Sequence, residues 1–482
     1  MTDRTAAAES AGAKTRHLLI GPAVFLILIA LPLPEIEYPI RASIGLLIWM
    51  SLWWIFQPVH LAVTGFLPLA VLAIFDFHPV TDILPAYAQQ LVILLLGANM
   101  LATLWTRWGL DRRIALVSLI GIGTGTRQQI LAWFVVATVL STFLPNTVVA
   151  AAMIPIVIAM LKFVGIEDVG KSAFGSALLI AVAWGSSVGG SGTPMGGAPN
   201  LLTVQFIQDQ IIDREFLFST WLTRLMPLTL LTALVALVFI RFAFRPEMKQ
   251  VEGSQEYFSQ ELRKLGRMST PEKWALLLFL AALGLAFTRQ FFVELLPGLT
   301  PAFAFLVAGI LCFIIRHRSA PILTWQFAQE RMVWGLIYLF AGGSALGQIL
   351  SQTGTAGFIA DLLVPHAGSG GLLPIVVFVT LTIVLTQITS NTAATAIVVP
   401  ITISTFQTLG INPLPMVFIV AAAGNYGLML PSSSGGPAIA AGYGVNLQTM
   451  FKRGALLTGL IIVTLVSGGY LLTTFWPGFG VA

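Results

Sequence analysis

Long apolar segments separated by short polar stretches run along nearly the whole chain. A helix that crosses a bilayer needs about 20 mostly apolar residues, whereas a membrane β-barrel shows short segments of alternating polarity. The pattern predicts an all-α polytopic membrane protein with about eleven transmembrane helices. The predicted spans lie at about 18–34, 42–57, 60–75, 90–106, 172–208, 222–243, 274–291, 299–315, 332–350, 413–448 and 455–475.

Two further apolar stretches, 128–161 and 371–410, have a polar interruption near the middle. Each is too short for two full crossings with a turn between them, which together need more than about 40 residues. Two short arms that meet at a tip inside the membrane fit this length better. The sequence therefore predicts two re-entrant hairpins.

The composition agrees with a membrane protein and excludes other classes. Hydrophobic residues make up 57% of the chain and charged residues 9%, against about 25% charged residues in average soluble domains. An ordinary soluble protein, a disordered chain and a nucleic-acid binder are therefore excluded. The single cysteine, Cys312, excludes a disulfide within the chain.

The distribution of positive charge predicts the orientation in the membrane. With the N-terminus in the cytoplasm and both hairpins returning to their own side, all but four of the 25 Lys and Arg residues lie at cytoplasmic ends. Such a bias is typical of cytoplasmic loops. The first hairpin then enters from the cytoplasm, the second enters from outside, and the C-terminus lies outside. The four outer residues are Arg41, Arg214, Arg224 and Arg289.

A charged cytoplasmic connection, residues 245–273, divides the chain into two parts. Residues 1–244 contain spans 1–6 and the first hairpin, and residues 274–482 contain spans 7–11 and the second hairpin. Segment 114–126 is too short to span, so we expect a helix along the cytoplasmic interface there. Residues 351–370 are its expected counterpart on the outer side.

The hairpin tips belong to an internal repeat. Residues 145–156 read PNTVVAAAMIPI and residues 390–401 read SNTAATAIVVPI, with five of twelve positions identical. Each tip is followed by a Gly/Ser/Pro-rich break inside a long span, at 185–200 and 430–438. Small residues also aid ordinary helix packing in membranes. A tip and a break in the same order in both halves instead favour the paired, inverted repeats of a secondary transporter.

The residues at these breaks predict an ion and anion site. Helices that start at Asn146 and Asn391 direct partial positive charge at an anion. Unwound carbonyls, together with the oxygens of Ser141, Thr386 and the two asparagines, suit a small cation such as Na⁺. No charged residue lies near either tip, which disfavours direct proton coupling. Ser186 and Ser187 have no base nearby in the sequence pattern, which argues against an enzyme.

On these motifs the chain resembles the divalent anion/sodium symporter family, which carries dicarboxylates, citrate or sulfate. The resemblance rests on Ser390-Asn391-Thr392, on Pro145-Asn146-Thr147, and on the segments GGSGTPMGGAPN (189–200), WGLIYLFAGGSALGQILSQTG (334–354) and LRKLGRMSTPEK (262–273). It implies eleven spans and two hairpins, and a homodimer in the bacterial inner membrane. In each protomer, a transport domain moves like an elevator past a scaffold.

The resemblance also implies site residues. Those matching the family's substrate contacts are Asn146, Thr147, Gly197, Ser390, Asn391, Thr392 and Ser434. Those matching its sodium positions are Ser141, Asn146 and Gly196 at one site, and Thr386, Asn391 and Ser433 at the other. Sodium is the expected coupling ion, and no organic cofactor is expected.

The chain departs from the family pattern at Pro145, Gly197 and Pro437, where polar side chains are lost. Three functions therefore stay open. The first is sodium-driven symport of a C4-dicarboxylate such as succinate or malate. The second is a sodium-independent anion exchanger, or a carrier of citrate, sulfate or another oxyanion. The third is a channel or a membrane scaffold that transports nothing.

Overall fold

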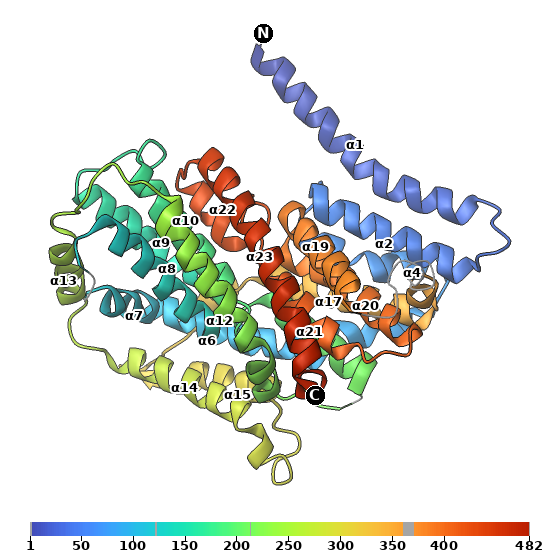
Figure 1. The fold of residues 1–482 in the computed structure, drawn as a ribbon. Helices are drawn as coiled ribbons and strands as arrows, with labels where there is room; N and C mark the ends of the chain where they lie inside the picture. The colour runs from blue at the N-terminus through green and yellow to red at the C-terminus, as the bar shows by residue number, and fades with distance from the viewer. Residues whose placement is uncertain (1, 121–122, 213, 360–370, 482) are drawn as a thin grey trace.

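Proline and glycine mark where many of the helices begin and end. Proline stands at the first or second position of α2, α4, α14 and α15, where the N–H that it lacks has no partner within the helix. Helix α6 ends at Trp108, and the φ of 71° at the following Gly109 lies in the left-handed region that glycine adopts without strain. The apolar runs between these residues form the helices of Figure 1.

A computed structural model describes residues 2–120, 123–212, 214–359 and 371–481. The helices described before the central connection are α1 (Thr2–Ala30), α2 (Tyr38–Phe56), α3 (Leu61–Thr64), α4 (Leu67–Phe75), α5 (Val80–Ile83), α6 (Gln90–Trp108), α7 (Leu110–Leu119), α8 (Thr126–Phe143), α9 (Asn146–Phe163), α10 (Ala173–Gly189), α11 (Ala198–Ile207) and α12 (Phe218–Ala243), with short turns at Leu84–Ala88 and Gln208–Ile212.

The central connection contains α13 (Ser254–Leu265). The helices after it are α14 (Thr270–Phe287), α15 (Pro301–Ile314), α16 (Trp325–Arg331), α17 (Trp334–Gln352), α19 (Leu372–Ile388), α20 (Asn391–Thr408), α21 (Leu414–Ala423), α22 (Gly435–Gly442) and α23 (Leu447–Phe475), with short turns at Arg289–Phe291 and Pro477–Gly480. Strands β1 (Arg316–His317) and β2 (Ala320–Pro321) form a small antiparallel hairpin.

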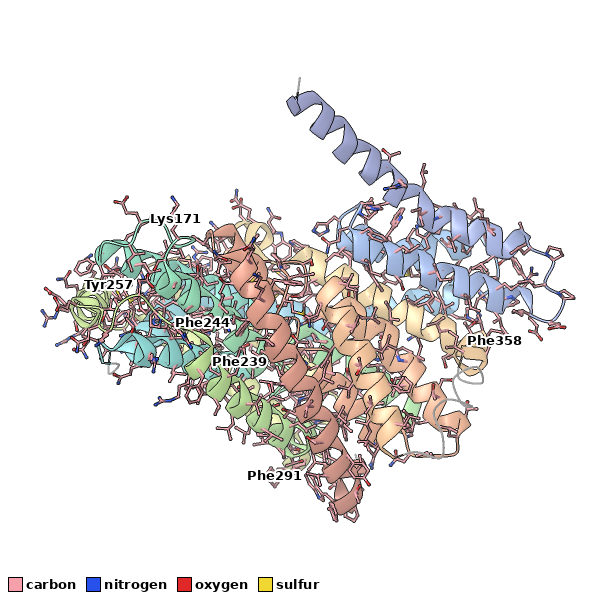
Figure 2. All side chains as sticks on the ribbon, turned by 45° about the horizontal axis from the view of Figure 1, so that its top comes forward. Lys171, Phe239, Phe244, Tyr257, Phe291 and Phe358 are labelled. Carbon is pink, nitrogen blue, oxygen red and sulfur yellow. The ribbon has the colours of Figure 1, made fainter. Side chains whose placement is uncertain are left out.

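The all-α membrane fold is confirmed. Within the described residues, seven helices are long and apolar enough to cross a membrane, and six shorter helices are also apolar. Every predicted span contains a helix, although the count of eleven stays a prediction. In Figure 2, Lys171 and Tyr257, which we predict on the cytoplasmic side, lie at the upper left of the molecule, and Phe291 lies at its lower edge.

The helices pack as two bodies. The hairpin body comprises α8–α12 and α19–α23, in which α10 packs on α8, α9 and α22, and α23 packs on α12 and α19. The flanking body comprises α1–α6 and α14–α17, in which α6 packs on α15, α1 on α2, and α17 on α3. The two bodies meet mainly where α17 packs against α20 and α11, with smaller contacts of α2 on α20, α6 on α11 and α14 on α12. The contact of α17 forms one edge of the candidate site.

Each predicted hairpin is a pair of antiparallel helices with a short tip. Leu144 and Pro145 join α8 to α9, and Thr389 and Ser390 join α19 to α20. Both tips end against a helix break in the interior of the protein rather than at its surface. Such a position is what a re-entrant hairpin requires.

The two helix breaks are confirmed, but the second begins earlier than predicted. The first lies between Gly189 and Ala198, inside the predicted range 185–200. The second lies between Ala423 and Gly435, whereas the sequence predicted 430–438. The reason is the Gln387 side chain, whose oxygen accepts the N–H groups of Leu428 and Met429, both at 2.9 Å. These bonds replace helical ones, so the backbone unwinds before the predicted point.

The predicted interface helix at 114–126 has the wrong boundaries. Helix α7 starts at Leu110, directly after the left-handed Gly109, and ends at Leu119. Residues 121–122 lie outside the described chain, and Gly125 pairs with Gln250 as an isolated β-bridge. The glycines of this segment favour such extended backbone over a helix. Of the predicted outer counterpart at 351–370, residues 360–370 also lie outside the described chain.

Candidate functional site

A cavity of about 450 Å³ lies where the two hairpin tips approach each other. The hairpin body supplies both tips and the start of α22, and the flanking body supplies walls from α6 and α17. Its volume falls in the range of small-molecule sites, about 300–1,000 Å³. The polar wall consists mainly of tip and break residues: Asn146, Thr147, Ser390, Asn391, Thr392, Ser433 and Ser434.

One hydrogen bond recurs in both halves and places each tip. The N–H of Asn146 donates to the carbonyl of Gly196, and the N–H of Asn391 donates to the carbonyl of Ser433, both at 3.1 Å. In each half the first residue of the hairpin's second helix is thus fixed to the last turn of a break. Most of the N–H groups that follow are bonded locally, Thr147 to the Asn146 side chain and Ala393 to the Ser390 hydroxyl. The positive ends of the α9 and α20 dipoles still lie at the cavity wall and contribute positive potential there.

The other predicted site residues lie behind the tips rather than in the cavity wall. The Ser141 hydroxyl donates to the Ser186 carbonyl at 2.6 Å, and the Thr386 hydroxyl donates to the Ile383 carbonyl at 2.7 Å. A methyl group added to Gly196 would lie 2.5 Å from the carbonyl oxygen of Ser141. Gly197 likewise lies outside the wall. Backbone oxygens therefore converge behind the first tip.

The two tip asparagines differ in their hydrogen bonding. The side-chain oxygen of Asn146 accepts the backbone N–H of Thr147 at 2.7 Å and its hydroxyl at 3.2 Å. The side-chain NH₂ of Asn391 donates to the Asn425 carbonyl at 2.9 Å. Its side-chain oxygen is buried and has no hydrogen-bond partner within the described residues. A buried oxygen without a partner is costly, so this atom is suited to a cation.

Two further asparagines, not predicted as site residues, connect the two breaks. The Asn425 NH₂ donates to the Asn200 side-chain oxygen at 2.7 Å, and the Asn200 NH₂ donates to the Gly190 carbonyl at 2.6 Å. In the described part of the chain the Asn425 side-chain oxygen also has no partner. A methyl group added to Gly197 would lie 2.4 Å from it. The signal was present in the sequence, because Asn425 stands between two glycines in an apolar run.

The two glycines before Pro437 have a steric role. A methyl group added to Gly435 would lie 2.2 Å from the Thr147 hydroxyl. At Gly436 it would lie 2.7 Å from the Ser186 hydroxyl. The two glycines therefore let the start of α22 approach the first tip and α10 closely. A larger residue at position 435 would displace Thr147 from the cavity wall.

The charged side chains that line the cavity lie at its open end, away from the tips. Among the described residues that line it, Asp111 is the one acidic side chain and Arg331 the one basic side chain. Asp111 accepts the backbone N–H of Arg112 at 2.7 Å and the Thr106 hydroxyl at 3.3 Å. Burial raises the pKa of the Asp111 carboxyl above its ordinary value. An anion at the tips would therefore be held without a neighbouring Lys or Arg.

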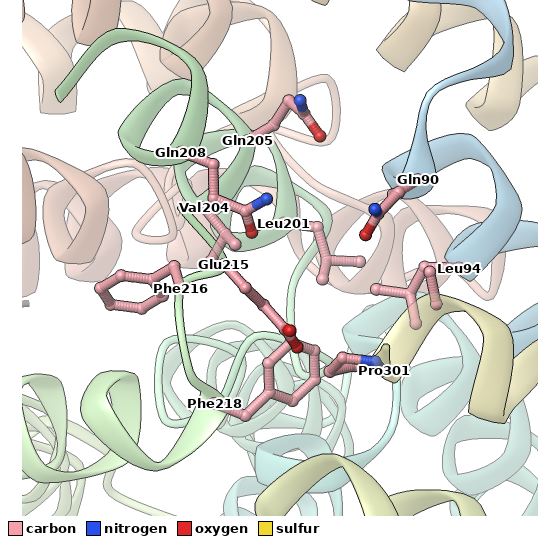
Figure 3. A pocket seen from close by; sticks show the side chains of 11 residues that line it. Gln90, Leu94, Leu201, Val204, Gln205, Gln208, Glu215, Phe216, Phe218 and Pro301 are labelled. Atoms are coloured by element: carbon pink, nitrogen blue, oxygen red, sulfur yellow. The ribbon is translucent and has the colours of Figure 1, made fainter. Parts of the chain in front are cut away.

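Beyond the tips the space between the two bodies nearly closes. A small pocket of about 40 Å³ lies between α6, α11 and α15, with Gln90, Gln205 and Glu215 in its wall (Figure 3). Leu201 lines both this pocket and the large cavity. The large cavity reaches the exposed residues Thr106 and Arg331 at its other end. The site is therefore accessible from the side of α7 and closed at Leu201.

Comparisons with known proteins give one consistent result. Residues 13–480 match the family described as the sodium:sulfate symporter transmembrane region. The sodium-dependent dicarboxylate transporter SdcS of Staphylococcus saprophyticus is 29% identical over 94% of this chain and 90% of its own length. SdcS of Staphylococcus aureus is 28% identical over 93% and 90%. The crystal structure of the Alcanivorax borkumensis YdaH transporter has a TM-score of 0.55 at 14% identity, covering 92% of this chain and 99% of that one.

We predict that Asp111→Asn stabilises the protein at neutral pH. Because the folded-state pKa of Asp111 is raised, the folded state holds the proton at pH values where the unfolded state has lost it. The free energy of unfolding then falls as pH rises from about 4, the unfolded pKa, through the folded pKa. Thermal unfolding in detergent should show a higher Tm for the variant at pH 7 and the same Tm below about pH 4.

Asp168→Asn serves as the control of opposite sign. Its exposed carboxylate accepts a hydrogen bond from Lys171, which lowers the pKa of Asp168. This variant should lose a little stability at pH 7 and none at low pH. A lower Tm for Asp111→Asn at pH 7 would show that the ionised carboxylate is stabilising, contrary to the prediction.

Proposed function

The chain belongs to the sodium:sulfate symporter family and is a membrane transporter rather than an enzyme, and from this membership and its site we propose that it couples sodium entry to the uptake of a small divalent anion. A C4-dicarboxylate such as succinate or malate is the proposed substrate. The two SdcS relatives are named as sodium-dependent dicarboxylate transporters, which supports a dicarboxylate over sulfate.

One observation supports this function above all others. Two helices start at one cavity, at Asn146 and Asn391, and no Lys or Arg among the described lining residues lies beside them. Two positive helix ends suit two separate carboxylates better than one compact oxyanion. In our proposal one carboxylate meets Asn146 and Thr147, and the other meets Ser390, Asn391 and Thr392.

Sodium supplies the positive charge that the side chains lack. Hard cations prefer oxygen ligands, and oxygens without donors lie close behind the tips. These are the side-chain oxygens of Asn391 and Asn425, and the backbone carbonyl of Ser141 lies next to Gly196. Sodium bound there would offset the charge of the anion and hold the tips in place. We propose Ser141, Asn146 and Gly196 for one ion, and Thr386, Asn391 and Ser433 for the other.

The packing supports an elevator movement between the two bodies. The substrate residues belong almost entirely to the hairpin body, and the contact with α17 is made by small or apolar residues such as Gly343 and Ala396. With the N-terminus in the cytoplasm, the mouth beside α7 faces the cytoplasm, so this is an inward-facing state. Sliding of the hairpin body past α17 would expose the tips to the other side. A homodimer stays a prediction.

The test is uptake of radiolabelled succinate into proteoliposomes, with and without an inward sodium gradient. Unlabelled sulfate and citrate serve as competitors. Accumulation that requires sodium supports the proposal. Uptake without sodium, seen only when succinate is preloaded, would contradict symport and favour an exchanger, as the lost polar groups at Pro145 and Pro437 would allow. Equal competition by sulfate would contradict the dicarboxylate assignment.

We predict that Thr392→Val lowers kcat/KM for succinate uptake roughly ten- to hundredfold. A hydroxyl that binds a charged group contributes about 1.5–3 kcal/mol, which corresponds to this factor. Thr392 lines the cavity and is 5% exposed. Thr408→Val is the matched control, because Thr408 is exposed at the other end of the same helix, α20. Equal effects of the two variants would remove Thr392 from the site.

We predict that a disulfide between the two bodies stops transport reversibly. A methyl group added to Gly343 on α17 would lie 3.1 Å from the Cβ of Ala396 on α20, a little closer than the 3.5–4.5 Å between the Cβ atoms of a disulfide. Gly343→Cys and Ala396→Cys are combined in a Cys312→Ser background, which removes the native thiol. Oxidation should abolish succinate uptake and reductant should restore it, while each single variant stays active under oxidant.

Full uptake by the oxidised, demonstrably crosslinked protein would contradict the elevator movement. The extent of crosslinking is measured independently, by the change in reactivity of the two thiols toward a maleimide. This measurement distinguishes a disulfide that did not form from a disulfide that formed and left transport unchanged.

A further inference from the structure

A basic hollow of about 670 Å³ lies away from the transport cavity, where α12 ends and both α10 and α23 begin. It lies on the side of the molecule that we predict to be cytoplasmic. Figure 2 shows Lys171 beside the first turns of α23, with Phe244 and Phe239 following along α12. Its polar wall includes Lys171, Arg245, Asn446, Lys452 and Arg453.

The hollow carries uncompensated positive charge. Lys171 is paired with Asp168 at 3.0 Å. Glu247 accepts the backbone N–H of Phe174 at 2.8 Å and the Ser172 hydroxyl, so it is already engaged at the start of α10. Within the described chain no ion pair involves the other three basic residues, Arg245, Lys452 and Arg453. Three cations on one concave surface favour an anionic ligand.

An apolar groove continues directly from this hollow. The groove has a volume of about 590 Å³ and runs between α12 and α23. It shares Ala243 and Arg453 with the basic hollow. Its remaining wall is entirely apolar: Leu234, Val235, Val238, Phe239, Phe242 and Leu460. Phe242 is 72% exposed and Leu234 56% exposed, so the groove opens on the outer surface of the helices.

We propose that the hollow and the groove together bind one anionic phospholipid of the cytoplasmic leaflet. The phosphate lies against Arg245, Lys452 and Arg453, and one acyl chain lies along the groove between α12 and α23. Guanidinium groups bind phosphate oxygens in a bidentate manner. A soluble anion would use the hollow but would leave the groove without a function. The combination of both features is what identifies a lipid.

The site lies wholly on the hairpin body, because α10, α12 and α23 all belong to it. The lipid would therefore travel with the body that carries the transport site. Its headgroup would also keep the ends of α12 and α23 at the membrane surface. This inference concerns a second ligand and uses no residue of the proposed sodium or substrate sites.

The first test is native mass spectrometry of the full chain released from mixed phosphatidylethanolamine and phosphatidylglycerol. The wild type should retain phosphatidylglycerol preferentially. The triple variant Arg245→Gln/Lys452→Gln/Arg453→Gln should lower this preference by at least about tenfold, given the contribution of each basic residue near an anionic surface. The control triple variant Arg263→Gln/Arg267→Gln/Lys273→Gln removes the same charge from exposed positions on the same side. It should keep the preference.

The second test changes the groove and leaves the charges intact. The substitution Val238→Trp fills the groove with an indole ring. Because the Val238 side chain is 49% exposed, we expect the variant to fold. It should lower retention of phosphatidylglycerol and leave the thermal shift caused by soluble glycerol phosphate unchanged. Equal loss in both triple variants would mean general charge attraction and would overturn the site. An unchanged lipid preference in Val238→Trp, with glycerol phosphate stabilising as strongly as the lipid, would mean a soluble-anion site.

Succinate uptake by these variants separates this inference from the proposed function. Loss of lipid preference with sodium-driven uptake still present would support the lipid site alone. Absence of uptake in the wild type would leave the lipid result interpretable, because retention is measured without transport.

Discussion

The structure depends on how unwound backbone is satisfied inside an apolar protein. A break in a membrane helix leaves N–H and C=O groups without partners, and no bulk water is present to bind them. Here each break is closed by the tip of a hairpin, through the N–H of Asn146 to Gly196 and that of Asn391 to Ser433. Gln387 bonds three backbone groups of the second break. Without these contacts, neither the tips nor the breaks would hold their shape.

The same arrangement leaves a particular set of groups unused. The positive ends of the α9 and α20 dipoles lie at one cavity, while oxygens of Asn391 and Asn425 remain buried without donors in the described chain. Positive helix ends toward the cavity suit an anion, and acceptors behind it suit a cation. Because no basic side chain among the described lining residues lies beside the tips, neither ligand is fully compensated alone. Interdependent binding of the two is the physical basis that we propose for coupling.

The larger features of this fold could be predicted from the sequence, because hydropathy and the paired Asn-Thr motifs report on them directly. The helix pairs of the two predicted hairpins and the first break lie where the sequence predicted them, while their re-entrant position in the membrane stays a prediction. The second break did not, because its early start depends on Gln387, a side chain distant in sequence that replaces helical hydrogen bonds. Asn200 and Asn425 were missed as partners for a similar reason. The glycines on either side of Asn425 were a local signal, but the contact joins residues from different halves, and no local pattern reveals its partner.

The most direct measurement is the dissociation constant for succinate of the purified protein, determined by calorimetry across a series of sodium concentrations at constant ionic strength with potassium. If sodium and the anion share the tips, the affinity for succinate rises with sodium, and succinate raises the affinity for sodium by the same factor. Replacement of Asn391 by Ala should remove this dependence. A dissociation constant that is the same in sodium and in potassium would contradict coupling through the paired hairpin tips.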